Sequence, residues 1–338
     1  MAQRRKFIYF LGAGASYGAG AVATVQAGGH LPIPTQSTFW ETFLRFCVGA
    51  NRRRDIESFL FRYFRGYARP PTRLAAPARR KQLAPIDVEE VFTFLSERIR
   101  APSTSPQLKT YSLRVWDALV SEIGNVFRRF EANTQTRRIF RNLLDNHLRD
   151  FDVVVSFNYD TVFERSLPRR KRWGYASITS TQGTLAILKP HGSINWSLES
   201  NGTIHVDEDA EKSVVVAPTH LKFVSSGPVT PELAAGYLDQ SPQIQEVWSQ
   251  MERQMKAARA LVFIGYSFPV ADLYFSSVLR SVLADRETNP DIVVVNPDAV
   301  AISERLQNRF ALSKVIRYFD LTQFVQASRS EVISQLDG

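Results

Sequence analysis

Short apolar segments recur along this 338-residue chain, and they constrain its fold more than any other feature. Several are continuous rather than alternating, and each has the length of a strand. Continuous apolar runs are typical of strands buried on both faces, as in parallel sheets covered by helices. We therefore predict an α/β fold with a doubly wound, Rossmann-like parallel sheet, whose strands are residues 7–11, 153–157, 185–188, 214–217, 261–264, 292–295 and 315–319.

The stretch between the first two runs has a helical pattern instead. Its apolar residues recur at helical spacing, and prolines divide it into pieces. We expect helices over 38–48, 56–64, 88–99, 111–130 and 136–148, with Asp87 and Thr110 as N-caps of two of them. The predicted organisation is a catalytic core of residues 1–35 and 150–338 that contains a helical insertion of residues 36–149.

The first apolar run leads directly into a glycine-rich loop, Gly12-Ala-Gly-Ala-Ser16, with Gly18 close behind. Glycines after a strand let backbone N–H groups approach a phosphate at the start of a helix. The usual dinucleotide fingerprint also needs an acidic residue roughly 20 positions further on. The first acidic residue here is Glu41, which disfavours a dehydrogenase. The loop indicates either a nucleotide site of another kind or only a tight turn.

Composition limits the class of protein. Cys47 is the single cysteine, which excludes internal disulfides and a zinc site built on paired cysteines. Phe43, Leu44 and Phe46 precede it in a helical pattern, so we expect the thiol to be buried. No apolar stretch has the roughly 20 residues that a membrane helix needs, and residues 7–11 are too short for a signal peptide. A cytoplasmic protein without membrane contact is expected.

Positive charge is concentrated in four clusters. The net charge is +9, and the clusters are residues 52–54, 79–81, 137–138 and 169–172. Such clusters attract phosphate backbones, but they are also common on ordinary solvated surfaces. Contact with nucleic acid, above all through the basic insertion, therefore stays open.

Polar residues follow several of the predicted strands. The segments are Ser-Phe-Asn-Tyr-Asp at 156–160, Lys-Pro-His-Gly-Ser at 189–193, Phe-Ile-Gly-Tyr-Ser at 263–267 and Asn-Pro-Asp at 296–298. Open α/β sheets bind their ligands outside the carboxyl ends of the strands. We expect these segments to meet at one edge of the sheet.

Taken in order with the glycine loop, these segments resemble the sirtuin-like superfamily. Its NAD site is lined by a Gly-Ala-Gly-x-Ser loop, an Asn-x-Asp after a strand, a His-Gly, a Gly-x-Ser and a strand that ends in Asn. The resemblance implies that Asn158 and Asp160 face the nicotinamide and its ribose and that His191 is the general base. It also implies two binding sets: Gly12, Ala13, Gly14 and Ser16 for the pyrophosphate, and Gly265, Ser267 and Asn296 for the adenosine half.

Two departures indicate a branch of that superfamily. Protein deacylases carry a four-cysteine zinc ribbon after the His, and this chain has no cysteine there. They also carry an Ile-Pro-Asp-Phe-Arg run where residues 32–35 here read Pro-Ile-Pro-Thr. The chain looks instead like the zinc-free bacterial domains of antiviral defence systems that hydrolyse NAD, and segment 215–220 resembles theirs. NAD as substrate, with no zinc and no further cofactor, is what this implies.

The chemistry of NAD hydrolysis agrees with this interpretation of the residues. Cleavage of the nicotinamide–ribose bond releases a neutral leaving group through an oxocarbenium-like state, so orientation and a base suffice. Local alternatives are that Asn158 caps a helix near Thr161 and that Asp160 is only a first-turn acid. Competing functions are an ADP-ribosyltransferase, a zinc-free deacylase, and a nucleotide- or nucleic-acid-binding module without turnover.

Regulation is expected to come from outside the active site. Uncontrolled NAD loss would harm the host cell, and the sequence shows no obvious sensor domain or Gly-x4-Gly-Lys-Ser/Thr motif. We therefore expect a homo-oligomer or a separate partner. The resemblance suggests a HerA-type ATPase or an Argonaute-like protein as that partner.

Overall fold

A parallel sheet forms the centre of the molecule. The computed structural model describes residues 6–24, 29–71, 73–179, 184–199, 203–208, 213–215, 241–269, 272–310, 312 and 314–337. Within them, seven strands form one sheet in the order β13-β12-β11-β1-β4-β6-β5, and every pairing in it is parallel. The strands are β1 (Phe7–Leu11), β4 (Val153–Ser156), β5 (Trp173–Tyr175), β6 (Leu185–Leu188), β11 (Ala260–Ile264), β12 (Asp291–Val295) and β13 (Val315–Tyr318).

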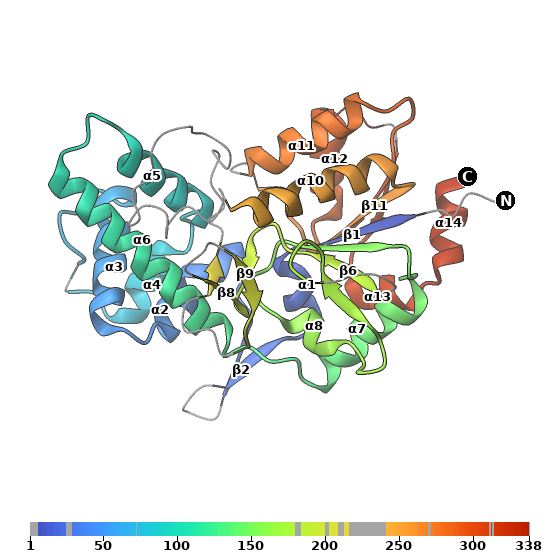
Figure 1. The fold of residues 1–338 in the computed structure, drawn as a ribbon. Helices are drawn as coiled ribbons and strands as arrows, with labels where there is room; N and C mark the ends of the chain where they lie inside the picture. Colours follow the sequence, from blue (N-terminus) through green and yellow to red (C-terminus); the bar gives the residue numbers. More distant parts are fainter. Residues whose placement is uncertain are drawn as a thin grey trace.

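Helices cover both faces of this sheet, which confirms the predicted fold class (Figure 1). One face carries α10 (Pro242–Ala257), α11 (Leu273–Ala284) and α12 (Ala299–Phe310). The other carries α1 (Ala13–Gly18), α7 (Thr134–Asn146), α8 (Val162–Ser166) and α13 (Leu321–Gln326). A last helix, α14 (Arg329–Asp337), ends the chain. The strand order reverses at β1, so a crevice is expected at the carboxyl ends of β1, β4 and β11.

A helical region lies beside the sheet (Figure 1). It consists of α2 (Phe39–Phe46), α3 (Ala50–Phe64), α4 (Ala76–Leu83), α5 (Val88–Arg100) and α6 (Pro106–Phe127). Its core is aromatic: the Phe59 ring contacts those of Tyr63, Phe64, Phe94 and Tyr111. The next helix, α7, packs on α8 and α13 of the sheet layer instead. The exact limits of the predicted insertion stay a prediction.

Of the two N-caps predicted from the sequence, one is confirmed and the other is wrong. The Asp87 carboxylate accepts from the Glu89 amide at 2.8 Å, which confirms it as the N-cap of α5. Thr110 is not a cap, because α6 begins earlier, at Pro106, with the Ser105 hydroxyl accepting from the Leu108 amide. A proline is well suited to the first turn of a helix, and here it sets the start of α6.

One predicted strand lies outside the main sheet. Val214–Val215, here β10, pairs antiparallel with β7 (Gly192–Ser193), and residues 216–217 lie outside the described part. The seventh position in the main sheet belongs to β5, which has no continuous apolar run to reveal it. Shorter elements are η1 (Gln36–Thr38) and two antiparallel pairs, β2 (Val22–Thr24) with β3 (His30–Pro32) and β8 (Trp196–Leu198) with β9 (Ile204–Val206).

Two further sequence expectations concern Cys47 and the membrane. Cys47 is buried as predicted, and burial raises the pKa of its thiol to about 12. The thiol is therefore protonated and a poor nucleophile at neutral pH. No helix in the described residues has the length and apolar character needed to cross a membrane.

Candidate active site

The loop after β4 is joined to the glycine loop by the side chain of Asn158. Its amide nitrogen Nδ2 donates to the Gly12 carbonyl at 3.0 Å and to Ser16 Oγ at 3.3 Å. A backbone carbonyl can only accept, so the nitrogen must face it and Oδ1 must face the other way. Within the described hydrogen bonds Oδ1 accepts none, and the side chain is only half-buried. Asn158 thus presents an oriented acceptor beside β1.

Asp160 lies behind this contact and not at the surface. Its carboxylate accepts from Ser16 Oγ at 3.2 and 3.3 Å and from the Val162 amide at 2.9 Å, and the residue is 4% exposed. Burial raises the pKa of Asp160 to about 6, although Lys189 acts in the opposite direction. Asp160 therefore holds Ser16, which in turn contacts Asn158, and it also accepts a hydrogen bond from the first amide of α8.

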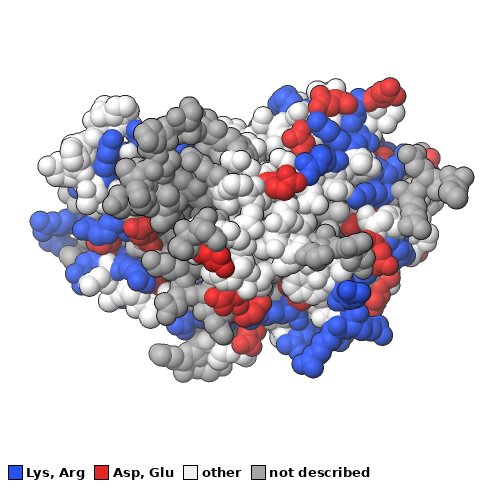
Figure 2. Space-filling view, in the orientation of Figure 1, with Lys and Arg blue, Asp and Glu red and all other residues white. Residues whose placement is uncertain are grey.

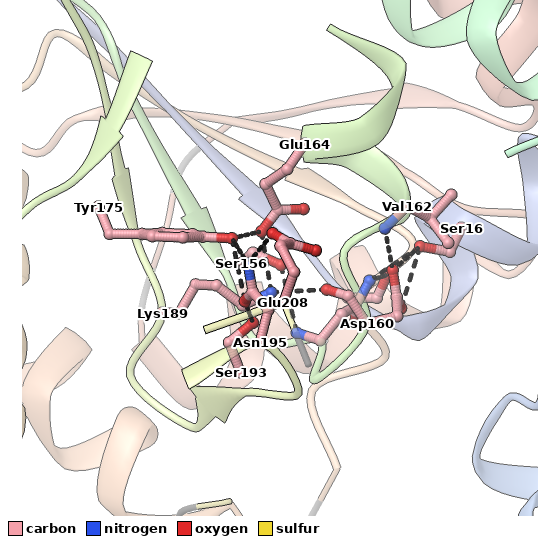
Figure 3. A network of polar contacts seen from close by, with 12 residues as sticks. Ser16, Ser156, Asp160, Val162, Glu164, Tyr175, Lys189, Ser193, Asn195 and Glu208 are labelled. Atoms are coloured by element: carbon pink, nitrogen blue, oxygen red, sulfur yellow. Dashed lines mark hydrogen bonds and ion pairs between the residues drawn. The ribbon is translucent and has the colours of Figure 1, made fainter. Parts of the chain in front are cut away.

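A buried lysine joins the end of β6 to the same loop (Figure 3). Lys189 is 0% exposed, and its Nζ donates to the Asp160 carbonyl at 2.6 Å and to Glu164 Oε1 at 2.9 Å. A charge in the interior is tolerated only when it is paired and hydrogen-bonded. Lys189 therefore fixes the positions of the Asp160 backbone and of α8 relative to β6.

The contacts of Lys189 continue into a larger buried polar network, which reaches the surface at Glu208 (Figure 3). The Tyr175 hydroxyl donates to Glu164 Oε1 at 3.2 Å, and Asn195 Nδ2 donates to Glu208 Oε1 at 2.8 Å. Glu164 Oε2 is buried and accepts no hydrogen bond from any described residue. The members of this network are Asp160, Glu164, Tyr175, Lys189, Ser193, Asn195 and Glu208. It supports the site but is not fully satisfied.

His191 lies in an aromatic environment that includes the two residues next to Asn158 in the chain. Its ring centroid is 5.2 Å from that of Phe157, 6.0 Å from Trp248 and 6.3 Å from Tyr159. Phe157 and Tyr159 flank Asn158 in the chain, so Asn158 and His191, two of the three predicted catalytic residues, lie on adjoining loops. The Trp248 indole donates to the Pro190 carbonyl at 3.1 Å, which anchors the His191 loop to α10.

Three glycines allow the loops after β1 and β11 to pack closely. A Cβ on Gly12 would lie 2.6 Å from the Gly265 oxygen, and one on Gly14 would lie 2.8 Å from the Gly265 Cα. The amides of Gly12 and Gly14 donate to the carbonyls of Ile264 and Gly265, and Gly265 has a φ of 61°. These glycines are required by the packing itself. Binding of pyrophosphate by Gly12, Ala13, Gly14 and Ser16 remains a prediction.

The other predicted binding residues lie at the ends of β11 and β12. Ser267 is exposed, and its Oγ donates to Gln36 Oε1 at 3.4 Å. Asn296 Oδ1 accepts from the Asp298 amide at 3.0 Å, so its side chain has a local role at the start of α12. Because β11 and β12 are neighbours, both residues lie at the same sheet edge as Asn158. Their roles toward adenosine stay predictions.

Lys189, Glu164 and Trp248 were not predicted as site residues, and only some of them have a signal in the sequence. Lys189 directly follows the apolar run 185–188, where a charge stands out, but its partner Glu164 comes from a helix with no distinctive pattern. Trp248, which anchors the His191 loop, lies far along the chain on α10. Segment 215–220 falls almost wholly outside the described residues. In the described part, no group of three His, Cys, Asp or Glu side chains could hold a metal ion.

A comparison with protein families finds a match over the part of the chain that carries much of this site. The family model described as "SIR2-like domain" matches residues 152–319. The chain contains a SIR2-like domain. The match runs from the start of β4 to the end of β13, so this SIR2-like domain includes Asn158, His191 and Asn296 but not the glycine loop. A search of curated proteins found no match.

Solved structures of Sir2 proteins resemble the chain only distantly. A Sir2 homolog in complex with NAD is 13% identical, with 98% of this chain and 91% of that chain covered and a TM-score of 0.42. A Sir2 homologue mutant in complex with ADP-ribose is 16% identical, with 69% and 79% covered and a TM-score of 0.35. A structure that concerns the mechanism and regulation of Sir2 enzymes is 11% identical, with 99% of this chain and 95% of that chain covered and a TM-score of 0.34. Likeness at this level transfers no residue role.

Proposed function

We propose that this protein is an NAD⁺ glycohydrolase that gives nicotinamide and ADP-ribose. The observation that carries the proposal is the fixed side chain of Asn158, whose Oδ1 faces away from its two anchors and whose loop adjoins His191. An oriented acceptor on one loop and an imidazole on the adjoining loop, at the carboxyl edge of a sheet in a SIR2-like domain, support hydrolysis of a glycosidic bond.

The reaction adds one water and releases one proton. The bond between the ribose C1′ and the nicotinamide nitrogen breaks, its electron pair leaves with the neutral nicotinamide, and water oxygen bonds to C1′. Asn158 Oδ1 would orient the water or a ribose hydroxyl, and His191 would accept the proton. Asp160 would act indirectly, because it holds the Ser16 hydroxyl that contacts Asn158.

The two proposed binding sets would hold the rest of NAD⁺ on either side of the Gly12–Gly265 contact. Gly12, Ala13, Gly14 and Ser16 would line the pyrophosphate, and Gly265, Ser267 and Asn296 the adenosine half. Gly12 and Gly14 contact Gly265 directly, so the two sets adjoin each other at the carboxyl ends of β1 and β11. NAD⁺ is substrate here, and the proposed chemistry needs neither zinc nor another cofactor.

The biological role is proposed from the motif resemblance. We propose an effector of antiviral defence that depletes NAD⁺ in the cytoplasm and acts as a homo-oligomer. Its control would come through assembly or through a separate HerA-type ATPase or Argonaute-like protein. The ordered motifs of the zinc-free branch, described above from the sequence, support this role.

The test is release of nicotinamide and ADP-ribose from NAD⁺, measured by liquid chromatography with the protein alone and with the product of a neighbouring gene. Asn158→Ala and His191→Ala should each reduce turnover by about 10²- to 10⁴-fold, as positioned catalytic groups commonly do. His205→Ala is the matched control, because His205 is exposed and bonds only Ser197 and Glu199 in the described contacts.

Thermal unfolding of each variant shows whether the fold is retained. Near-normal turnover in folded Asn158→Ala or His191→Ala would overturn the proposed mechanism. Binding of NAD⁺ by calorimetry without release of nicotinamide under either condition would instead indicate a binding module. Transfer of ADP-ribose to protein, with no free ADP-ribose, would indicate a transferase.

A further inference from the structure

Two basic segments far apart in the sequence meet on one face of the sheet layer. Arg137, Arg138 and Arg141 project from α7, and Arg169 and Arg170 follow α8, which packs against α7. A hollow of about 460 Å³ lies between them, lined by Arg141, Asp145, Pro168, Arg169 and Arg170. Adjoining hollows share Asp145 with it and extend it along α7. We call this surface the arginine groove, and Figure 2 shows Lys and Arg side chains gathered over α7 and α8.

The arginines of the groove are available for a ligand. All five are exposed, and within the described residues none forms an ion pair. The clusters of the helical region differ, because Arg52 pairs with the buried Glu122 at 2.9 Å and Arg79 pairs with Glu57 at 2.8 Å. One carboxylate, that of Asp145, lies in the groove and opposes an anion there. The balance in the groove is still strongly positive.

The composition of the groove favours phosphate over a protein partner. The large hydrophobic residues exposed in the described part are Tyr17, Val48, Tyr67, Leu198, Val206, Leu273, Val300 and Phe319, and none lies in the groove. Protein interfaces usually need an apolar core surrounded by a polar rim, which this surface lacks. Guanidinium groups match phosphate oxygens in a two-pronged geometry. With no exposed aromatic side chain for base stacking, the contact would be to the backbone alone.

We propose that the arginine groove binds the phosphodiester backbone of nucleic acid without sequence preference. The 13-residue helix α7 is about 20 Å long. One strand of a DNA duplex carries about six phosphates over that length, at roughly 3.4 Å each. Five arginines distributed over α7 and the segment after α8 therefore suit several successive phosphates. The inference is independent of the proposed NAD⁺ chemistry.

The experiment measures binding of the full chain to a fluorescent 20-base-pair DNA duplex and to a 20-nucleotide RNA strand over a salt series. The test variant is Arg138→Gln, Arg141→Gln, Arg170→Gln. Each lost phosphate contact should reduce the slope of log affinity against log salt by about 1, and affinity at low salt should fall by roughly tenfold or more. The affinities for the two probes show whether the protein prefers duplex DNA or single-stranded RNA.

The matched control is Arg53→Gln, Arg54→Gln, Lys81→Gln, which removes the same charge from exposed positions of the helical region. It should keep the slope and most of the affinity. The proposal is overturned if neither probe binds at low salt, if the two triple variants lose affinity equally, or if polyglutamate displaces the probes as readily as unlabelled DNA. Thermal unfolding checks that both variants fold, and neither touches Asn158 or His191.

Discussion

The two ends of strand β4 carry two buried aspartates in contrasting environments. Asp152, at the amino end, uses both carboxylate oxygens: it accepts from the amides of Phe7 and Arg149 at 2.8 Å each and forms an ion pair with Arg329. Arg329 also lies over the Phe7 ring, with its guanidinium carbon 4.1 Å from the ring centroid. The amino end is a saturated network that ties α14 to the sheet.

The carboxyl end of β4 is less completely satisfied. Burial raises the pKa of Asp160 to about 6, and the neighbouring Glu164 Oε2 is buried without a hydrogen bond from the described residues. Shifted carboxyl groups and unsatisfied polar atoms are more common at functional sites than in purely structural networks. One strand thus carries a structural network at one end and the candidate site at the other.

Removing the lysine at the carboxyl end should have the largest effect. Lys189→Met leaves Glu164 without its cation in the interior, so we expect the free energy of unfolding to fall by about 3–5 kcal/mol. NAD⁺ turnover should fall as well, because the Asp160 backbone loses its anchor. Urea unfolding and nicotinamide release measure the two effects.

Two further variants test whether the loss of the Lys189–Glu164 pair is the cause of these effects. Lys189→Met combined with Glu164→Gln should recover much of the stability but not the turnover. Lys171→Met, which removes a surface ion pair with Asp150, should change either quantity little. Full activity in folded Lys189→Met would show that this network does not position the site.

Removing the arginine at the amino end should affect stability alone. Arg329→Met breaks the buried pair with Asp152, and the free energy of unfolding should fall by about 3 kcal/mol. Turnover per folded molecule should be unchanged, because the site lies at the other end of β4. Arg259→Met is the control, since Arg259 is exposed and its partners Asp291 and Asp337 are partly to fully exposed. A selective loss of turnover in Arg329→Met would contradict the division between the two ends.

The smallest expected effect is a pH dependence from Asp160. Its pKa is raised from 3.8 to about 6, so between those values the folded state holds a proton that the unfolded state releases. Stability from this group is present below about pH 4 and is lost as pH rises through 6. Asp160→Asn lacks this loss, so its stability relative to wild type should improve by up to roughly 1.4 kcal/mol per pH unit.

The comparison of two proteins is necessary because His147 acts in the opposite direction. Burial lowers the pKa of His147 to about 4, so its contribution to stability rises over the same pH window. That contribution is common to wild type and Asp160→Asn and cancels in their difference. Urea unfolding at several pH values from 4.5 to 7 gives this difference, and parallel curves would show that Asp160 titrates normally.

Much of the sheet could be predicted because buried parallel strands require continuous apolar runs. β1, β6 and β12 are such runs, and each lies close to its expected limits. β5 could not be found, because Trp173–Tyr175 has a glycine at its centre and no apolar run. Val214–Val215 is apolar but too short to show which partner it pairs with.

The site could be predicted only in part. Ordered motifs after successive strands predict Asn158, Asp160 and His191 as site residues, because parallel topology brings strand ends together, and their roles stay predictions. The direction of the Asn158 amide could not be predicted, since it depends on the Gly12 carbonyl from another strand. The same holds for the Lys189–Glu164 pair, which exists only once β6 lies beside the loop after β4.

The position of β1 at the centre of the sheet has a consequence for synthesis of the chain. Ile8 pairs with Val153 on one side and with Leu261 on the other. At about 5–20 residues per second, β1 would leave the ribosome roughly 10 to 50 seconds before β11 is available. During that time one of the most apolar strands of the molecule has an open edge, which is where unfolded chains pair with one another. We therefore expect the nascent protein to need protection of β1 until β11 has been made.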